Sequence, residues 1–403
     1  MLACEYDLSS PESNKQFLDD FCSRTLFTYR DQFTPISQDQ DMIEMDASPP
    51  PHGFSAVHRE AGGILSDAGW GCMIRVTQMA LVQCLIYHTL GRDWRFNTRA
   101  DLTPGATFWQ LIALFMDTPS APFSLHNIVR EGLKLGKRPS EWFGPTSGAL
   151  AVKSLMDQHG AQSCGLRCVT FPEGIIYTNE VLEAFSGVPR KEAADKAAGA
   201  SSSSGGPSAP AGPSSSPSEC PTADEPQAAQ QAKRESSGPA EDVSGVVIWL
   251  CLRLGVDSFN VDKYQSPIQA CFSIPQFQGL AGGGPANSAY FFVAANRENL
   301  YFLDPHSKCQ AAFTEIPSPT APEQLAAFAC QVHPSEPRQL AWSSLNPSMA
   351  LGFVCQTVDQ YEDLCARLKA VDADLFEILP TRPEYNYEGG LKTDEEDPDL
   401  VLL

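Results

Sequence analysis

The order of hydrophobic and polar positions predicts a helical first part of the chain and a strand-rich second part. Residues 73–90 are apolar on nearly every helical face and are followed by Gly91, which is typical of a buried central helix. Shorter helical patterns cover residues 108–116 and 147–158. Residues 243–255 then form an apolar run that predicts a buried strand.

The second part adds a hairpin, a late helix and a short strand. Residues 289–295 and 300–303 flank a polar turn and predict the two strands of the hairpin. Residues 361–371 have a helical pattern. Residues 376–379 favour a core strand, with a short partner-binding motif as the alternative. Helices first and strands afterwards, with a buried helix that begins near a cysteine, predict an α+β fold of the papain-like kind.

One segment of the chain differs from the rest in composition. Residues 199–242 contain no Val, Ile, Leu, Met, Phe, Tyr or Trp and are rich in Ser, Pro, Ala and Gly. Such a segment cannot bury enough apolar surface to offset the entropy of ordering it, so we expect it to be disordered. We also expect a flexible N-terminus over residues 1–18 and an acidic flexible tail over residues 385–403. The pattern alone leaves open whether 199–242 is an insertion within one domain or a linker between two.

Charge and hydropathy restrict the partners. The 28 Lys and Arg residues against 49 Asp and Glu residues give a formal charge of −21. Nucleic acids and anionic membranes are therefore not expected as general partners, because both require a positive protein surface. No apolar stretch approaches the ~20 residues of a membrane-spanning helix. Residues 1–10 lack the pattern of a secretory signal, so we expect a soluble cytoplasmic protein.

The sequence gives no sign of a metal or cofactor site. Its 13 cysteines are an odd number without a secretory signal, which favours free thiols over disulfides. Cys164 and Cys168 are the closest pair, but no second pair or nearby histidine accompanies them, so buried side chains are expected there rather than zinc. The chain has no HExxH motif, no phosphate-binding loop and no GxSxG motif. We expect neither a metal nor a cofactor.

Cys72 is the first candidate for chemistry. It follows Gly69, Trp70 and Gly71 and stands at the N-terminal edge of the predicted buried helix. The free N–H groups and partial positive charge of a helix N-terminus favour a thiolate, which is the reactive form of cysteine. The alternative is an inert core cysteine packed beside a tryptophan.

His306 is the second candidate. It follows Asp304 across one proline, directly after a predicted strand. Residues two apart on a strand share a face, so the carboxylate and the imidazole are expected side by side. A carboxylate beside histidine raises its basicity and fixes its orientation, as in a catalytic triad. The alternative is a turn with a surface histidine.

Several sequence blocks resemble the autophagins, the autophagy cysteine proteases that process the GABARAP-type ubiquitin-like modifier. The blocks occur in the family's order and leave out the segment 199–242. They are residues 27–30 (FTYR), 66–75 (SDAGWGCMIR), 91–95 (GRDWR), 142–145 (WFGP), 283–285 (GGP), 301–306 (YFLDPH) and 346–353 (NPSMALGF).

The resemblance implies a role for each matched residue. Cys72 would be the nucleophile, His306 the general base and acid, and Asp304 the residue that orients the histidine. Tyr29 would help to hold the oxyanion, and Trp142 would line the groove that admits the substrate's C-terminal glycine. Since the matched cysteine and histidine lie on opposite sides of the low-complexity segment, one catalytic domain would comprise residues 19–198 and 243–384, with 199–242 inserted.

The resemblance also implies the substrate. The enzyme would cleave the C-terminal extension of a GABARAP-type modifier after its glycine and would release the modifier from phosphatidylethanolamine. Gly284 and Pro285 belong to the loop that covers the active site in the family, and this loop is about one residue longer here. Two alternatives are an inactive relative that only binds the modifier and a cysteine protease for another ubiquitin-like protein.

Overall fold

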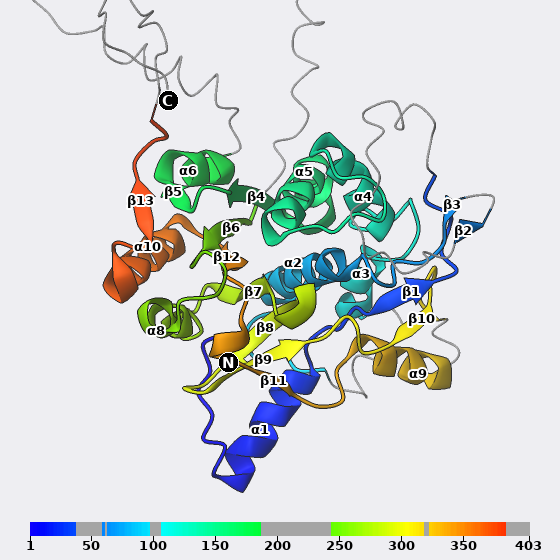
Figure 1. Ribbon diagram of the computed structural model, residues 1–403, viewed down its shortest axis with the longest axis horizontal. Coiled ribbons are helices and arrows are strands. Elements are labelled where there is room, and N and C mark those ends of the chain that lie inside the picture. The colour runs from blue at the N-terminus through cyan, green and yellow to red at the C-terminus, as the bar shows by residue number, and fades with distance from the viewer. Residues whose placement is uncertain (38–58, 61–62, 97–105, 187–242, 318–321, 384–403) are drawn as a thin grey trace, which may run out of the picture.

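The computed structural model describes residues 1–37, 59–60, 63–96, 106–186, 243–317 and 322–383 (Figure 1). The predicted segment 199–242 and the predicted tail 385–403 lie outside these residues. The helices are α1 (Pro11–Cys22), α2 (Cys72–Leu90), α3 (Thr107–Ala113), α4 (Leu125–Lys134), α5 (Pro145–Cys164), α6 (Thr178–Ser186), α8 (Val261–Cys271), α9 (Pro322–Val332) and α10 (Val358–Asp372), with short 3-10 turns η2 (Pro285–Asn287) and η3 (Trp342–Ser344). The strands are β1 (Tyr29–Asp31), β2 (Arg59–Glu60), β3 (Gly63–Ile64), β4 (Leu166–Phe171), β5 (Ile175–Tyr177), β6 (Gly245–Arg253), β7 (Phe277–Gly283), β8 (Ala289–Ala295), β9 (Asn299–Leu303), β10 (Cys309–Ala311), β11 (Arg338–Ala341), β12 (Ser348–Cys355) and β13 (Glu377–Leu379).

A seven-stranded sheet in the order β11-β9-β8-β7-β12-β6-β4 forms the centre of the fold. Its strands pair antiparallel except β4 and β6, which are parallel. β4 precedes and β6 follows residues 187–242, and the two strands are direct neighbours from Leu166↔Gly245 to Phe171↔Leu250. Both sides of the low-complexity segment therefore contribute to one sheet.

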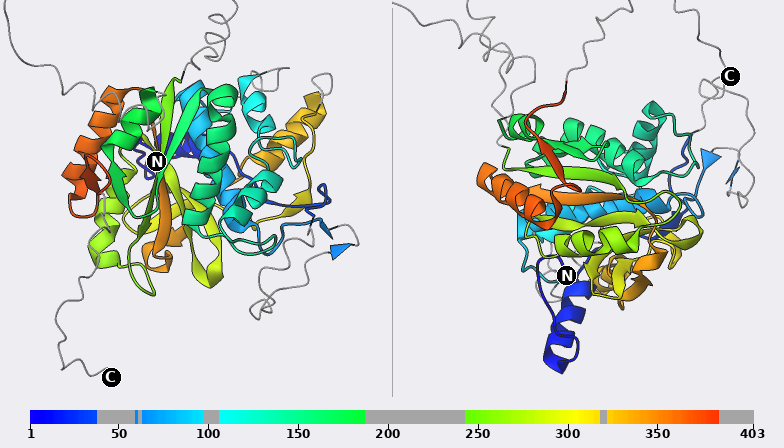
Figure 2. Two further views of the ribbon diagram at one scale, coloured as in Figure 1. Left: turned by 90° about the horizontal axis from the view of Figure 1, so that it is seen from above. Right: turned by 60° about the vertical axis from the view of Figure 1, so that its left-hand side comes forward.

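Helices cover both faces of this sheet (Figure 2). On one face α2 packs against β7 and β8, and α5 packs against β4 and against α2. On the other face α6 packs against β4 and β6, while α10 packs against β12 and α8. The fold is α+β, as predicted.

The central helix α2 is the strongest confirmed prediction. Every residue from Cys72 to Ile86 is buried, because α2 lies between the sheet and the neighbouring helices. The helix begins at Cys72 itself, one residue earlier than the apolar pattern. It ends at Gly91, whose φ of 86° is a conformation that glycine adopts without steric cost.

The other predicted elements are confirmed with shifted ends. The buried strand is β6, the hairpin is β8 and β9, and the late helix is α10. The helix predicted over residues 147–158 is longer, because Pro145 starts α5 and Gly165, in a left-handed conformation, ends it. The strand predicted at residues 376–379 is present as β13, which pairs parallel with β5 in a separate two-stranded sheet. It is not a core strand, because only Phe376 before it is buried, while Glu377 is exposed and the other two residues are half-buried.

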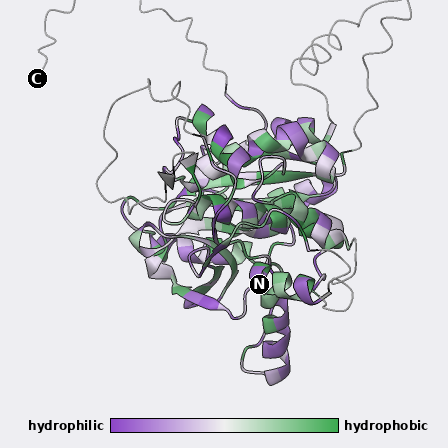
Figure 3. Ribbon diagram, turned by 90° about the vertical axis from the view of Figure 1, so that its right-hand side faces the viewer, coloured by the Kyte–Doolittle hydropathy of each residue, from purple (hydrophilic) through white to green (hydrophobic). Residues whose placement is uncertain are grey.

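The N-terminus differs from the prediction. Residues 1–18 were expected to be flexible, but the structure places Leu2 in the core and starts α1 at Pro11. The amide of Ala3 donates to the carbonyl of Phe272, and the buried ring of Phe17 packs against a tyrosine of β9. The prediction failed because α1 is mostly polar along its length (Figure 3) and is held by long-range contacts that local composition does not reveal.

A buried carboxylate anchors α1 to the rest of the molecule. Asp20 is fully buried and contacts the guanidinium groups of Arg24, Arg92 and Arg95, and it accepts a hydrogen bond from Tyr6 at 2.7 Å. Burial alone would raise the pKa of Asp20, but the three guanidinium groups lower it. The GRDWR block thus has a structural function, because its two arginines converge on one carboxylate.

Candidate active site

Cys72 is the first residue of α2. The amides of the first turn of a helix have no intrahelical carbonyl to bind, and the N-cap residue Gly71 offers no side chain to accept from them. The residue is 7% exposed, and it therefore lies at the edge of the core rather than deep inside it. The predicted setting for a thiolate at a helix N-terminus is present.

The backbone before Cys72 is held in a tight turn. The carbonyl of Asp67 accepts hydrogen bonds from the amides of Trp70 at 3.2 Å and Gly71 at 2.8 Å. A Cβ atom added at Gly71 would lie 2.6 Å from the Cβ of Asp67. Only glycine fits at this position without a shift of the turn, and the turn fixes the place of Cys72.

His306 and Asp304 meet as predicted. His306 Nδ1 lies 2.7 Å from Oδ1 of Asp304, and the same oxygen accepts the backbone amide of His306 at 2.9 Å. Burial lowers the pKa of His306, but the hydrogen bonds to Asp304 and Cys72 and the charges of both groups raise it to about 9. The imidazole therefore holds a proton at neutral pH, and the carboxylate fixes its orientation.

Tyr29 joins the cysteine and the histidine. Its backbone amide donates to the carbonyl of Pro305 at 3.0 Å, and β1 pairs parallel with β10, where Tyr29 lies opposite Cys309. Its ring packs edge-on against the His306 ring, with centroids 5.3 Å apart. Burial, followed by the charge of Cys72 and a hydrogen bond to it, raises the pKa of the Tyr29 phenol well above its usual range. The phenol remains protonated and can donate a hydrogen bond beside the thiol.

Trp142 lies next to the same turn. Its indole Nε1 donates to the carbonyl of Gly69 at 2.9 Å, and its side chain is 45% exposed. A flat aromatic surface is therefore open to solvent beside Gly69, which stands three residues before Cys72. This placement agrees with a wall of a substrate groove.

Gly284 and Pro285 lie in the turn between β7 and β8. The amide of Gly284 donates to the carbonyl of Ser288 at 2.8 Å, and a Cβ atom at Gly284 would lie 2.5 Å from the ring of Tyr290. The ring of Tyr290 in turn lies 5.7 Å from that of His306. The turn thus reaches the site through Tyr290, a residue that the sequence interpretation missed.

The sequence interpretation also missed a buried ionic cluster beneath the site, formed by Arg30, Asp67, Arg75 and Asp117. Arg75 Nε lies 2.6 Å from Asp67 Oδ2, and Arg75 Nη1 lies 2.8 Å from Asp117 Oδ1. The backbone amide of Arg30 donates to Asp67 Oδ1 at 2.6 Å. The cluster ties β1, the turn before Cys72 and α2 together. Charged residues within the otherwise apolar block 66–75 were the only signal in the sequence.

A second missed residue is Arg338, the first residue of β11. Its guanidinium contacts Oδ2 of Asp304, the oxygen that His306 leaves free. Burial raises the pKa of Asp304, but the hydrogen bonds from His306 and the charges of His306 and Arg338 lower it overall. Nothing in the sequence near Arg338 points to this contact.

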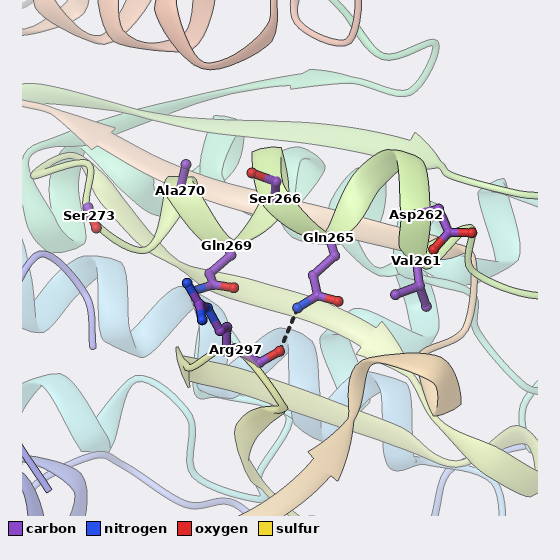
Figure 4. A pocket seen from close by; sticks show the side chains of 8 residues that line it. All are labelled: Val261, Asp262, Gln265, Ser266, Gln269, Ala270, Ser273 and Arg297. Carbon is purple, nitrogen blue, oxygen red and sulfur yellow. Dashed lines mark hydrogen bonds between the residues drawn. The ribbon is translucent and has the colours of Figure 1, made fainter.

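Two further features lie apart from these residues. Within the described ranges, no group of three or more histidine, cysteine or acidic side chains is arranged as metal ligands would be, and no helix is long and apolar enough to cross a membrane. A surface cavity of ≈ 570 Å³ opens between α8 and the turn after β8 (Figure 4), where Gln265 Nε2 donates to the carbonyl of Arg297 at 2.6 Å. None of the predicted site residues lines this cavity.

The geometry brings the thiol of Cys72, the imidazole of His306, the carboxylate of Asp304 and the phenol of Tyr29 together. Residues 14–367 match the family model described as the peptidase C54 catalytic domain. The chain belongs to the peptidase C54 family. The predicted family and the papain-like α+β fold are confirmed, and the family is one of peptidases.

Relatives support the assignment. "Cysteine protease ATG4" of Cryptococcus neoformans is 32% identical over 75% of this chain and 27% of its own length. "Cysteine protease 1" of Neurospora crassa is 29% identical over 93% of this chain and 62% of its own length. "Cysteine protease ATG4A" of Xenopus laevis is 27% identical over 96% of this chain and 82% of its own length. The chain thus spans less than two thirds of the two fungal proteins.

Proposed function

We propose that this peptidase C54 member is an autophagy protease that cleaves a GABARAP-type ubiquitin-like modifier after its C-terminal glycine. The observation that carries the proposal is the convergence of Cys72, His306, Asp304 and Tyr29 at the start of α2. The same chemistry would release the modifier from phosphatidylethanolamine. We place this activity in the cytoplasm, with no metal or cofactor required.

The first step would be acylation of the enzyme. The Cys72 thiolate attacks the glycine carbonyl carbon and forms a C–S bond. The oxyanion accepts hydrogen bonds from the Cys72 backbone amide and from the Tyr29 phenol. The imidazolium of His306 gives its proton to the leaving amine, and the C–N bond breaks. The C-terminal extension departs as an amine and leaves a thioester.

The second step would be hydrolysis of the thioester. The now neutral His306 takes a proton from water, and the hydroxide equivalent attacks the thioester carbon. The C–S bond breaks, the thiolate and imidazolium are restored, and the glycine carboxylic acid is released and loses its proton to water. Delipidation follows the same two steps with the ethanolamine nitrogen of the lipid as the leaving amine. The enzyme would then meet membranes through its substrate, in keeping with its acidic composition.

Selectivity for glycine would come from the surface around Cys72. The exposed ring of Trp142 stands over Gly69 and would leave room for a residue without a side chain. The turn with Gly284 and Pro285 would cover the bound C-terminus from the opposite side. Bulkier residues at the cleavage site would collide with the ring.

The test uses purified protein and a GABARAP-type modifier that carries a C-terminal extension, with Cys72→Ala and His306→Ala beside the wild type. Cleavage after the glycine by the wild type alone supports the proposal. Binding without cleavage by the wild type would assign an adaptor function instead. If the protein neither binds nor cleaves this modifier, a panel of probes for other ubiquitin-like proteins identifies the substrate. A second assay measures release of the modifier from phosphatidylethanolamine in vesicles.

A further inference from the structure

We propose that Arg338 is a positioning residue that acts on His306 through Asp304. Its guanidinium contacts Oδ2 of Asp304, while the His306 imidazolium contacts Oδ1. The two cations therefore share one carboxylate. The inference deepens the proposed protease function and rests on it, because it concerns the same histidine. No motif match assigned a role to this arginine.

The two oxygens of Asp304 are divided between two cations. Oδ1 accepts Nδ1–H of His306 at 2.7 Å and the backbone amide of His306 at 2.9 Å. Oδ2 contacts the guanidinium of Arg338. The Asp304 side chain is only 9% exposed, so few water molecules can replace a lost partner. An ionised carboxylate in this position needs donors on both oxygens.

Sheet register brings Arg338 to this place. β11 pairs antiparallel with β9, and Arg338 lies opposite Phe302. Asp304 follows two residues later, just beyond the end of β9, where the chain turns towards His306. The first residue of the edge strand β11, Arg338, therefore lies beside Oδ2 of Asp304.

The electrostatic consequence follows from the groups around His306. The imidazole faces Cys72 and Asp304, with the rings of Tyr29 and Tyr290 against its sides. Arg338 adds a positive charge on the far side of Asp304. This charge opposes the imidazolium, so Arg338 limits how firmly His306 holds its proton. Deacylation requires neutral imidazole, and hence a limit on the basicity of His306 favours turnover.

A surface ion pair without function is the competing explanation. The Arg338 side chain is 51% exposed, and ion pairs between two exposed side chains contribute little to folding stability, but the partner Asp304 is only 9% exposed. The chain offers a matched control in Arg367, which is 48% exposed and pairs with Asp363 at 2.7 Å on α10. Removing either charge should leave the fold intact, but only one of the two arginines contacts the histidine's partner.

The experiment compares wild type with Arg338→Met, Arg338→Lys and Arg367→Met. Alkylation of Cys72 by iodoacetate is followed from pH 6 to pH 10.5, because this anionic reagent reacts fastest while the imidazolium is present. The rate of alkylation should decline at high pH as the imidazolium loses its proton, and we call this decline the basic limb. For Arg338→Met we expect the midpoint of the basic limb to rise by about half a pH unit, as removal of one nearby positive charge predicts. The kcat for the extended modifier at neutral pH should fall about threefold together with KM, so that kcat/KM is kept, because less neutral imidazole is available for deacylation.

The controls make the outcome decisive. Arg338→Lys should keep the wild-type limb, and Arg367→Met should match the wild type in both assays. An unshifted limb in Arg338→Met overturns the inference, even if kcat falls, since a purely structural defect leaves the limb in place. If the wild type does not cleave the modifier but the limb still moves, the proposed substrate is wrong and the role of Arg338 stands. Thermal unfolding of each variant confirms that it is folded.

Discussion

Tyr29 is the residue whose effect is easiest to isolate. Replacing Tyr29 by Phe removes one hydroxyl next to Cys72 and keeps the ring against His306. Loss of one oxyanion donor should lower kcat about 10²- to 10³-fold, with little change in KM. Steady-state cleavage of the extended modifier measures this.

The matched control is Tyr301→Phe, which removes a buried hydroxyl that accepts a hydrogen bond from Asn296 and lies outside the catalytic group. It should retain wild-type kcat. A Tyr29→Phe enzyme within about threefold of wild type would show that the backbone amide holds the oxyanion without the phenol.

The protonation of His306 predicts a pH limit. Its pKa is raised to about 9, so the imidazolium is present at neutral pH and is lost as the pH rises through about 9. Acylation should fall over the same range. The stabilisation that His306 gives to the folded state has the same sign: it is complete below the unfolded pKa of about 6.5 and is lost as the pH rises through the folded pKa.

The measurement is the pH dependence of kcat/KM from pH 6 to pH 10.5, with folding monitored by circular dichroism at each pH. A decline centred near pH 6.5 would contradict the prediction, because it would mean that Asp304 does not raise the basicity of His306. Asp304→Asn should move the decline to lower pH.

At the scale of elements, Gly71 fixes the entry into α2. In Gly71→Ala the new Cβ would meet Asp67, so the turn and Cys72 must shift. Since small displacements of reacting groups cost large factors in rate, kcat should fall at least about tenfold. Gly144→Ala is the control, because nothing lies within 4 Å of its added Cβ. Equal kcat values for the two variants would contradict this role of the turn.

Removing the shared cation of the buried ionic cluster should lower the stability of the fold and should not act on the catalytic rate alone. Arg75→Met leaves the fully buried carboxylates of Asp67 and Asp117 without their shared cation. The free energy of unfolding should fall by about 3–5 kcal/mol. Urea denaturation measures the change, with Arg367→Met on the surface of α10 as the control. A loss no larger than that of the control would show that the cluster does not hold the elements together.

Sequence patterns located the elements well where periodicity is local. α2, β6 and the hairpin of β8 and β9 were predicted, because each buries a continuous apolar surface that its own residues display. α1 was missed, because it is polar and is held by the contacts of Asp20 and Leu2 with distant segments.

At the scale of the whole molecule, the pairing of β4 with β6 predicts the effect of a deletion. We propose that residues 199–242 are an insertion in one catalytic domain. Replacing them by a short Gly/Ser linker should change the free energy of unfolding by no more than about 1 kcal/mol, since closure entropy varies only with the logarithm of loop length. Cleavage should be retained. Two separate unfolding transitions in the variant would contradict a single domain.

The sequence by itself determined the class of fold and the family, and it singled out the groups that we propose to react. A helix N-terminus, a strand followed by Asp304 and His306, and a run without apolar residues are local properties that are visible in the order of the residues. The resemblance then assigned roles to Cys72, Tyr29 and Trp142.

Only the tertiary structure decided how these groups meet. The docking of β1 beside β10 places Tyr29 against His306, and the register of β11 on β9 places Arg338 on Asp304. The buried cluster that supports Cys72 joins segments that are far apart in the chain. Such contacts depend on how strands and helices pack, and one sequence carries no local signal for packing between distant segments.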